Sequence, residues 1–130
     1  MPISSPVTRS RRAMMYVPGS DENKIVKSAT LGLDCAILDL EDGVAFNRKD
    51  EARGVIRQAL ERVDFGRTER LVRINPLYSG KAEQDLAAVL PGKPDAILIP
   101  KADSAAIVVA VEKIISAFEQ SQGWQEGEIA

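Results

Sequence analysis

Four short apolar runs, each followed by an amphipathic stretch, constrain the fold of this chain more than any other feature of its sequence. The runs cover residues 13–17, 35–40, 71–75 and 96–100. Nearly continuous apolar runs of this length are typical of strands buried on both faces of a parallel sheet. The alternation therefore predicts four βα units, and right-handed crossovers would place all four strands in one sheet.

The stretches between the runs have the apolar spacing and the end signals of helices. In the first stretch, Ser20 is the expected N-cap, and Ile25 and Val26 contribute to one apolar face. Asn47 and Ser104 are the expected caps of the second and last helices. These assignments give each strand a helix that can cover the sheet.

Two architectures fit this alternation: half of an eightfold β/α barrel, or a small doubly wound sheet. The pattern alone does not decide between them. A complete barrel needs ~250 residues, whereas this chain has 130. Residues 128–130 read as the start of a further apolar run, which favours a cut chain, and residues 1–11 are expected to form a disordered arm.

The composition excludes several classes of function. The net charge is -2 and the charges are interspersed, so we expect no nucleic-acid partner. No apolar run approaches the ~20 residues of a membrane span, so we expect no membrane partner. The single cysteine, Cys35, is expected in the core of a cytoplasmic protein, and the absence of histidine excludes Ser-His and Cys-His catalysis within this segment.

Polar residues follow the second apolar run, where the carboxyl end of a parallel strand would carry a site. Asp39 and Glu41 share one face of the strand by two-residue periodicity, and Asp42 points away. Three carboxylates at this point favour either a divalent ion such as magnesium or an acidic cluster that braces the loop. The residues alone leave these two interpretations open.

Three further positions at strand ends carry charge or turn signals. Arg73 lies within an apolar run, and its guanidinium suits a carboxylate or enolate oxygen, or an internal salt bridge to the acidic cluster. Lys101 follows the fourth run, where a structural or electrostatic role is favoured over a Schiff base. The turn at residues 18–20 is consistent with either an anion site or a capped helix start.

Several of these segments together resemble one known family. Residues 12–20, 38–45, 49–53, 72–76 and 97–101 are similar, in order and spacing, to the opening of citrate lyase β-subunit-like proteins. Those proteins belong to the HpcH/HpaI aldolase/citrate lyase superfamily, together with malyl-CoA and citramalyl-CoA lyases. The elements Leu40–Val44 and Val72–Asn75 are specific in combination, and the resemblance extends from about Arg11 to Val111.

The resemblance implies a fold and a set of ligands. The expected fold is an α/β (β/α)8 TIM barrel, of which this chain would supply the first four βα units at residues 12–130. The expected cofactor is Mg2+, with metal ligands and an acid–base aspartate that lie beyond Ala130. The expected partners are a CoA thioester and a 2-oxo acid, and the expected full-length assembly is a trimer or hexamer.

The resemblance also implies roles for particular residues. The substrate or CoA would contact Tyr16, Asn23, Lys27 and Arg73, although a basic residue is common in the family at the position of Asn23. Arg73 would be the catalytic residue of this segment. The acidic shell near the metal would comprise Asp39, Glu41 and Asp42.

The expected function is magnesium-dependent carbon–carbon cleavage of a 3-hydroxyacyl-CoA into acetyl-CoA and a 2-oxo acid. Citramalyl-CoA, malyl-CoA and a citryl thioester are the candidate substrates, and the segment alone is expected to be inactive. Two alternatives stay open: a metal-dependent aldolase acting on free 2-oxo acids, and a non-catalytic phosphate-binding or interaction module. The expected location is the cytoplasm, or the mitochondrion in a eukaryote.

Overall fold

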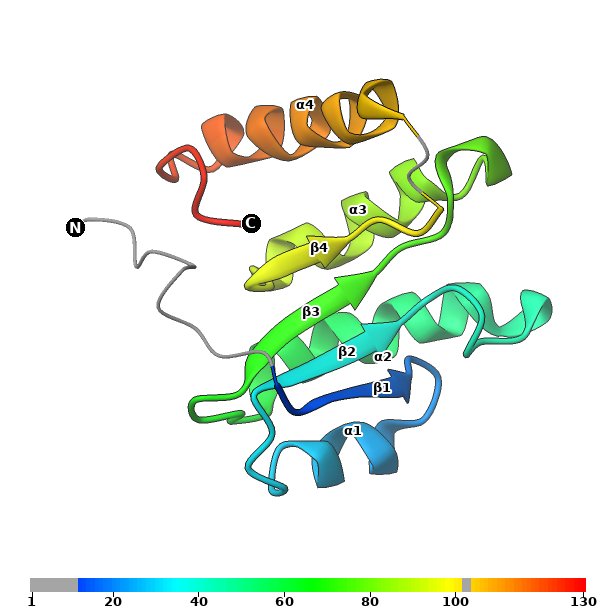
Figure 1. Cartoon of the computed structure of the whole chain (residues 1–130), viewed down its shortest axis with the longest axis vertical. Coiled ribbons are helices and arrows are strands. Elements are labelled where there is room, and N and C mark those ends of the chain that lie inside the picture. Colours follow the sequence, from blue (N-terminus) through cyan, green and yellow to red (C-terminus); the bar gives the residue numbers. More distant parts are fainter. Residues whose placement is uncertain (1–11, 102–103) are drawn as a thin grey trace.

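A computed structural model describes residues 12–101 and 104–130, and the arm expected at residues 1–11 lies outside the described part. The four strands form one parallel sheet in the order β1-β2-β3-β4. Their bounds are β1 Met14–Pro18, β2 Cys35–Asp39, β3 Glu69–Arg73 and β4 Ala96–Leu98. The predicted βα units are thus confirmed, with β4 shorter than the apolar run that predicted it (Figure 1).

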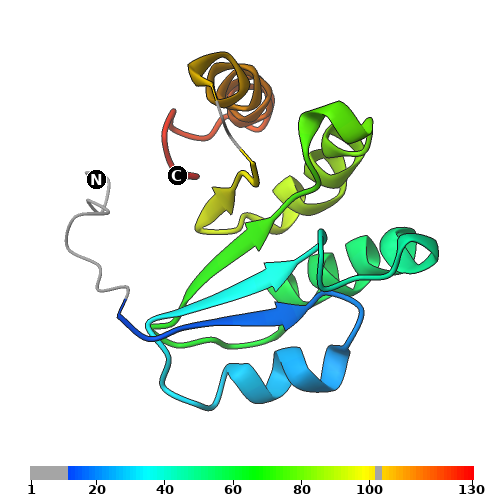
Figure 2. The same ribbon diagram turned by 45° about the vertical axis from the view of Figure 1, so that its right-hand side comes forward.

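Each strand is followed by a helix. The helices are α1 Glu22–Ser28, α2 Lys49–Arg62, α3 Ala82–Val89 and α4 Ala105–Ser121, with short 3-10 turns η2 Phe46–Arg48, η3 Leu77–Ser79 and η4 Leu90–Gly92. Helices α1, α2 and α3 cover one face of the curved sheet (Figure 2). None of the helices in the described part is long and apolar enough to cross a membrane.

Two apolar clusters pack on opposite faces of the sheet, as the two-residue period of a strand requires. The larger lies between the sheet and the helices and contains Ala36, Leu38 and Val72 from the strands. The smaller, on the other face, consists of Cys35, Ile37, Leu71 and Ala96. Because β2 is buried on both faces, its uninterrupted apolar sequence is explained by its central place in the sheet.

The helix ends differ in detail from the sequence prediction. Asp21, not Ser20, caps α1 by accepting a hydrogen bond from the Lys24 amide. Asn47 does not cap α2, because a 3-10 turn places Arg48 at that position. Ser104 occupies the N-cap position of α4 without a side-chain hydrogen bond. Such errors of one residue arise because several polar residues in sequence can all cap a helix.

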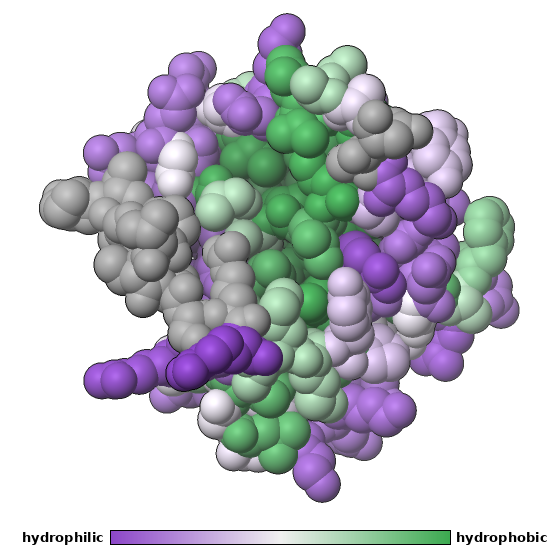
Figure 3. Space-filling model, viewed as in Figure 1, coloured by the Kyte–Doolittle hydropathy of each residue, from purple (hydrophilic) through white to green (hydrophobic). Residues whose placement is uncertain are grey.

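The β4 side of the sheet carries an apolar groove. Figure 3 shows apolar side chains gathered over β4 and α4, and a groove of about 500 Å³ lies there, lined in part by Ile97, Ile99, Val111, Ile115 and Ile129. The Ala130 amide donates to the Asp95 carbonyl at 3.0 Å, and the Ile97 amide donates to the Ala130 carbonyl at 2.9 Å. This is the hydrogen-bond pattern of a parallel ladder, so Ala130 pairs with the edge of β4.

A buried ionic network, which the sequence pattern did not reveal, fixes the exit of β3. Asp85 of α3 is fully buried and accepts hydrogen bonds from the Arg53 side chain and from the amide and side chain of Asn75. Arg53 also pairs with Asp50 at the start of α2. The carboxylate of Asp85 therefore joins α2, α3 and the segment that follows β3 at a single point.

Replacement of Asp85 by asparagine should lower the free energy of unfolding by about 3 kcal/mol, because it leaves the buried Arg53 guanidinium without its main counter-ion. Urea unfolding of the variant chain measures the change. The matched control is Glu51→Gln, which removes an exposed ion pair with Arg48 and should cost under about 1 kcal/mol. Equal losses in the two variants would show that the network does not act as a buried pair.

Candidate functional site

The candidate site lies at the carboxyl ends of the strands, where the segments after β1, β2, β3 and β4 meet. Its centre is Arg73, the last residue of β3, whose register partner on β2 is Asp39. The guanidinium donates from Nε to Asp39 Oδ1 at 2.8 Å and from Nη2 to Asp39 Oδ2 at 2.7 Å. Two parallel hydrogen bonds of this kind fix both the position and the plane of an arginine.

Asp39 also organises the loop that follows β2. Its Oδ1 accepts a hydrogen bond from the Glu41 amide, and its Oδ2 accepts one from the Gly43 amide, both at 2.8 Å. A Cβ atom on Gly43 would lie 2.7 Å from Asp39 Oδ2, so only glycine permits this close approach. Of the two interpretations of the acidic cluster, loop bracing is therefore the one that Asp39 fulfils.

A second carboxylate, Glu41, lies between two cations. Its Oε2 accepts a hydrogen bond from Lys101 Nζ at 2.8 Å, while its Oε1 lies 3.5 Å from Arg73 Nη1. The Lys49 ammonium donates to the main-chain carbonyls of Leu40 and Glu41 at 2.7 and 2.9 Å. The side chain and the backbone of Glu41 are thus held separately, by different lysines.

Tyr16 contributes the aromatic surface of the site. The guanidinium carbon of Arg73 lies 4.6 Å from the centroid of the Tyr16 ring, within the range of a cation–π contact. The tyrosine is 53% exposed, whereas the Arg73 side chain is 18% exposed. Arg73 is therefore mostly buried but still reachable, and Tyr16 forms part of the accessible surface beside it.

A closely packed turn follows β1, the strand that carries Tyr16. Gly19 donates its amide to the Asp39 carbonyl at 2.8 Å. A Cβ atom on Gly19 would lie 2.6 Å from both that carbonyl oxygen and Ile56 Cδ1 of α2. The turn is therefore packed directly between the end of β2 and the buried face of α2.

Neighbouring charges change the proton affinities of the site. Burial raises the pKa of Asp39, but hydrogen bonds from Arg73, Glu41 and Gly43 outweigh it and hold this pKa below its ordinary value. The hydrogen bonds to Asp39 raise the pKa of Arg73. Hydrogen bonding to Glu41 raises the pKa of Lys101, which favours an ammonium over the neutral amine that a Schiff base requires.

The structure brings together only some of the residues named by the sequence analysis. Tyr16, Asp39 and Glu41 each contact Arg73, so these four residues lie together. Asn23 and Lys27 are exposed on α1, and among the described residues the ion-pair partners of Arg73 are the two carboxylates. Asp42 is exposed in the loop and outside these described pairs.

The described residues do not form a metal site by themselves. Within residues 12–101 and 104–130, no group of three or more His, Cys, Asp or Glu side chains is placed to hold a metal ion. Both oxygens of Asp39 accept hydrogen bonds from Arg73 and from backbone amides, and Glu41 is bound by Lys101. Saturated carboxylates of this kind are poor ligands for a hard cation.

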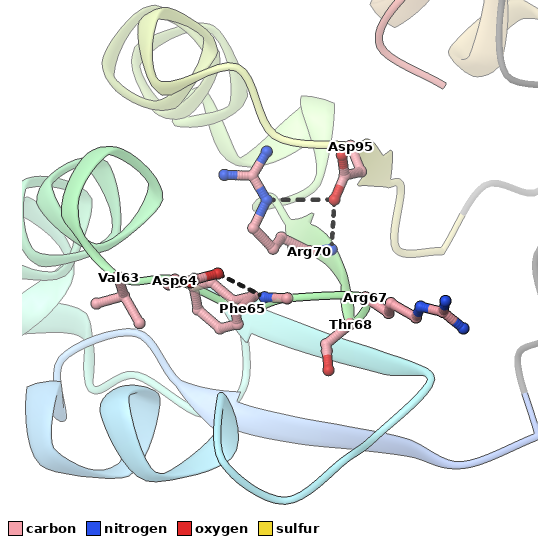
Figure 4. Close-up of a pocket in the computed structure, with 8 residues that line it drawn as sticks. Val63, Asp64, Phe65, Arg67, Thr68, Arg70 and Asp95 are labelled. Carbon is pink, nitrogen blue, oxygen red and sulfur yellow. Dashed lines mark hydrogen bonds and ion pairs between the residues drawn. The ribbon is translucent and has the colours of Figure 1, made fainter.

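A separate pocket of about 490 Å³, drawn in Figure 4, lies at the opposite edge of the sheet. Its walls include Thr68 and Asp95, which precede β3 and β4. Arg70 donates to Asp95 from both its amide and its side chain, and Gly66 donates to Asp64. These polar groups are engaged in holding the loops, so this pocket is not the candidate site.

A parallel sheet covered by helices, with an ion-paired arginine at the carboxyl ends of its strands, defines the class: an α/β protein built of βα units, with its candidate site at that edge. The chain belongs to the HpcH/HpaI aldolase/citrate lyase family, which it matches over residues 12–130. The resemblance stated from the sequence and the expected α/β fold class are thereby confirmed.

Individual relatives agree with this assignment. Mitochondrial citramalyl-CoA lyase of Homo sapiens is 51% identical over 96 residues, which are 72% of this chain and 28% of that protein. Citrate lyase subunit beta of Escherichia coli K12 is 38% identical over 120 residues, which are 92% of this chain and 40% of that protein. The chain spans less than half the length of these relatives.

A solved structure shares the fold. It is that of CitE from Mycobacterium tuberculosis in complex with magnesium, acetoacetate and coenzyme A, with a TM-score of 0.65 and 36% sequence identity. The match covers 78% of this chain and 38% of that one. The two proteins therefore share the arrangement of these first strands and helices.

The lowered pKa of Asp39 predicts a particular loss of stability in acid. A carboxyl whose folded pKa lies below its unfolded value of ~3.9 stabilises the fold above that value and loses this contribution as the pH falls through the folded pKa. The free energy of unfolding should therefore decrease from about pH 5 downward. Asp39→Asn should flatten this decrease, whereas Asp42→Asn, an exposed neighbour, should leave it unchanged. Identical acid profiles for all three chains would contradict the role of the ion pair.

Proposed function

We propose that this chain is the N-terminal half of a (β/α)8 barrel that cleaves the carbon–carbon bond of a 3-hydroxyacyl-CoA thioester. The candidate substrates are citramalyl-CoA, malyl-CoA and a citryl thioester, and the products are acetyl-CoA and a 2-oxo acid. Family membership and the likeness to citramalyl-CoA lyase support this proposal. The single observation that carries it is Arg73, oriented by Asp39 at the carboxyl edge of the sheet.

The chemistry places a specific demand on the site. The substrate hydroxyl loses its proton, and the bond between C2 and C3 of the acyl chain breaks. C3 becomes the carbonyl of the 2-oxo acid, and the electron pair moves through C2 onto the thioester oxygen to form an enolate. Protonation at C2 then gives acetyl-CoA. The negative charge on the enolate oxygen is the feature that a fixed cation can stabilise.

Arg73 is suited to this role. Its Nε and Nη2 atoms are engaged by Asp39, so the plane of the guanidinium is set before a ligand arrives. Its Nη1 atom makes only the longer, 3.5 Å approach to Glu41 and can donate to the enolate oxygen. Pre-oriented donors of this kind lower a barrier by about 3 kcal/mol because they need no reorganisation as the charge develops.

The other groups divide the binding of the substrate. Tyr16 presents an exposed ring beside Arg73, and the proposal places the thioester along it, with Lys27 and Asn23 on α1 toward the CoA moiety. Magnesium is included because the CitE complexes contain it. The described carboxylates do not fit the ion, so the proposal assigns no metal ligand to this chain and gives Asp39, Glu41 and Asp42 a supporting role.

The remaining parts of the proposal concern the whole protein. The parent lyase is proposed to assemble as a trimer or hexamer and to act in the cytoplasm, or in the mitochondrion of a eukaryote, as does the human relative by its name. The alternative, an aldolase acting on free 2-oxo acids, would not bind coenzyme A. A phosphate-binding module has less support, because α1 has only 7 residues and the Asp21 carboxylate already caps its N-terminus.

Substitution of Arg73 tests the proposed role. In the full-length lyase, Arg73→Ala should lower turnover of the CoA thioester about a hundredfold or more, because the enolate loses its cation. Steady-state kinetics measure the effect, and circular dichroism verifies the fold. The control is Arg57→Ala, which removes an exposed arginine paired with Glu61 on α2 and should keep turnover within about twofold. Near-normal turnover by the Arg73 variant would refute the assignment.

The segment alone should not catalyse the reaction. With magnesium and citramalyl-CoA or malyl-CoA supplied, the 130-residue chain is expected to release no acetyl-CoA above background, since its described carboxylates form no metal cluster. The full-length lyase, assayed in parallel, should release it and should bind coenzyme A in a calorimetric titration. Metal-dependent turnover by the isolated segment would contradict the proposal that the metal ligands lie outside this chain. Turnover of free acids by the full-length protein, without binding of CoA, would favour the aldolase.

A further inference from the structure

Glu41 holds an unusual position between two cations. Its side chain is 6% exposed, its Oε2 accepts a hydrogen bond from Lys101 at 2.8 Å, and its Oε1 stays 3.5 Å from Arg73 Nη1. A carboxylate and a guanidinium in direct hydrogen-bond contact would lie near 2.8 Å. Glu41 is therefore bound firmly to Lys101 and only loosely to Arg73.

The backbone at Lys101 suggests that its side chain is needed there. Lys101 has a φ of 52°, in the left-handed region that favours glycine. A side chain at such a φ is disfavoured, and an observed departure of this kind at a site is a reason to ask what the side chain does. At Lys101 the left-handed turn accompanies the 2.8 Å contact between its ammonium and the Glu41 carboxylate.

Glu41 is placed where it could occupy an N–H donor of Arg73 that the substrate needs. Asp39 engages the Nε–H and one of the two Nη2–H donors, so Nη1 is the group whose two N–H donors both stay clear of Asp39 and can meet an incoming anion. Glu41 is the buried carboxylate nearest to Nη1. If Lys101 did not hold it, Glu41 would have Arg73 as its nearest counter-ion and would move into contact with the same donor.

We propose that Lys101 is a positioning residue that holds Glu41 away from Arg73 Nη1 and so keeps this donor available to the anionic oxygen of the substrate. The identity of that oxygen rests on the proposed lyase function. The internal arrangement does not, because it concerns only Lys101, Glu41 and Arg73.

Kinetics of the full-length lyase test the consequence for the substrate. Lys101→Met should lower kcat for the thioester about tenfold, with a smaller change in KM, because Glu41 then competes for Nη1, which meets the enolate that forms only during the reaction. Lys101→Arg should restore most of the loss. The Lys101→Met effect should disappear in a Glu41→Gln background, since a neutral amide does not capture Arg73. A penalty that persists in that background would overturn the proposal and assign Lys101 to direct contact with the substrate.

The chain offers a closely matched control. Lys93 also has a left-handed backbone, with a φ of 54°, and also pairs with a glutamate, with its Nζ 2.9 Å from Glu128. It precedes β4 and so lies at the opposite edge of the sheet. Lys93→Met should leave kcat unchanged. A similar fall in kcat for both lysine variants would show a general loss of structure and would overturn the proposal.

A second readout on the same variants needs no turnover. In nitrogen-15 spectra of the guanidinium groups of the chain, Lys101→Met should slow the rotation of the Arg73 Nη groups, because Glu41 then binds Nη1 directly. Salt should not reverse this change, because the contact is buried. An unchanged Arg73 spectrum would overturn the positioning role. If the lyase assay fails but the spectrum changes as expected, the proposed function is wrong and the positioning role is supported.

Discussion

The bidentate contact between Arg73 and Asp39 is the interaction on which the site depends. Both residues end their strands, and they are partners in the register of β2 and β3. Since side chains alternate between the faces of a strand, a slip of one residue would place the two groups on opposite faces. The apolar packing that fixes the register therefore also fixes the geometry of the guanidinium.

The groups around this pair all hold the loop after β2 and its carboxylates in place. Backbone amides of Glu41 and Gly43 complete the hydrogen bonding of Asp39, Lys49 holds the main chain of the same loop, and Lys101 holds the Glu41 side chain. Asp39, Glu41, Arg73 and Lys101 therefore each have a defined partner before a ligand arrives. In a site arranged in this way, the side chains need little reorientation when negative charge develops in a reaction.

Much of the fold could be predicted because its signal is local. The apolar runs marked each strand, and the polar residues within or directly after those runs identified Asp39, Glu41 and Arg73 as neighbours. Two-residue periodicity placed Asp39 and Glu41 on one face, which the shared contacts to Arg73 confirm.

Other features could not be predicted, because they depend on contacts between distant segments. The role of Asp85 arises only when α2, α3 and the end of β3 meet, and Lys49 acts on carbonyl groups that leave no trace in a side-chain pattern. The pairing of Lys101 with Glu41 joins residues 60 positions apart. The cap of α1 was misplaced by one residue, since Ser20 and Asp21 are both good capping residues and only the backbone dihedrals decide between them.

The packing of Gly19 links the interior of the protein to its candidate site. The turn that follows β1, the strand that carries Tyr16, rests against the Ile56 methyl group on one side and the end of β2 on the other. A change in the volume of the buried Ile56 side chain on α2 would therefore press on this turn and on the end of β1, whose Tyr16 ring we propose to contact the thioester. Under the proposed function, substitutions on the inner surface of a helix can then change selectivity without contacting the ligand.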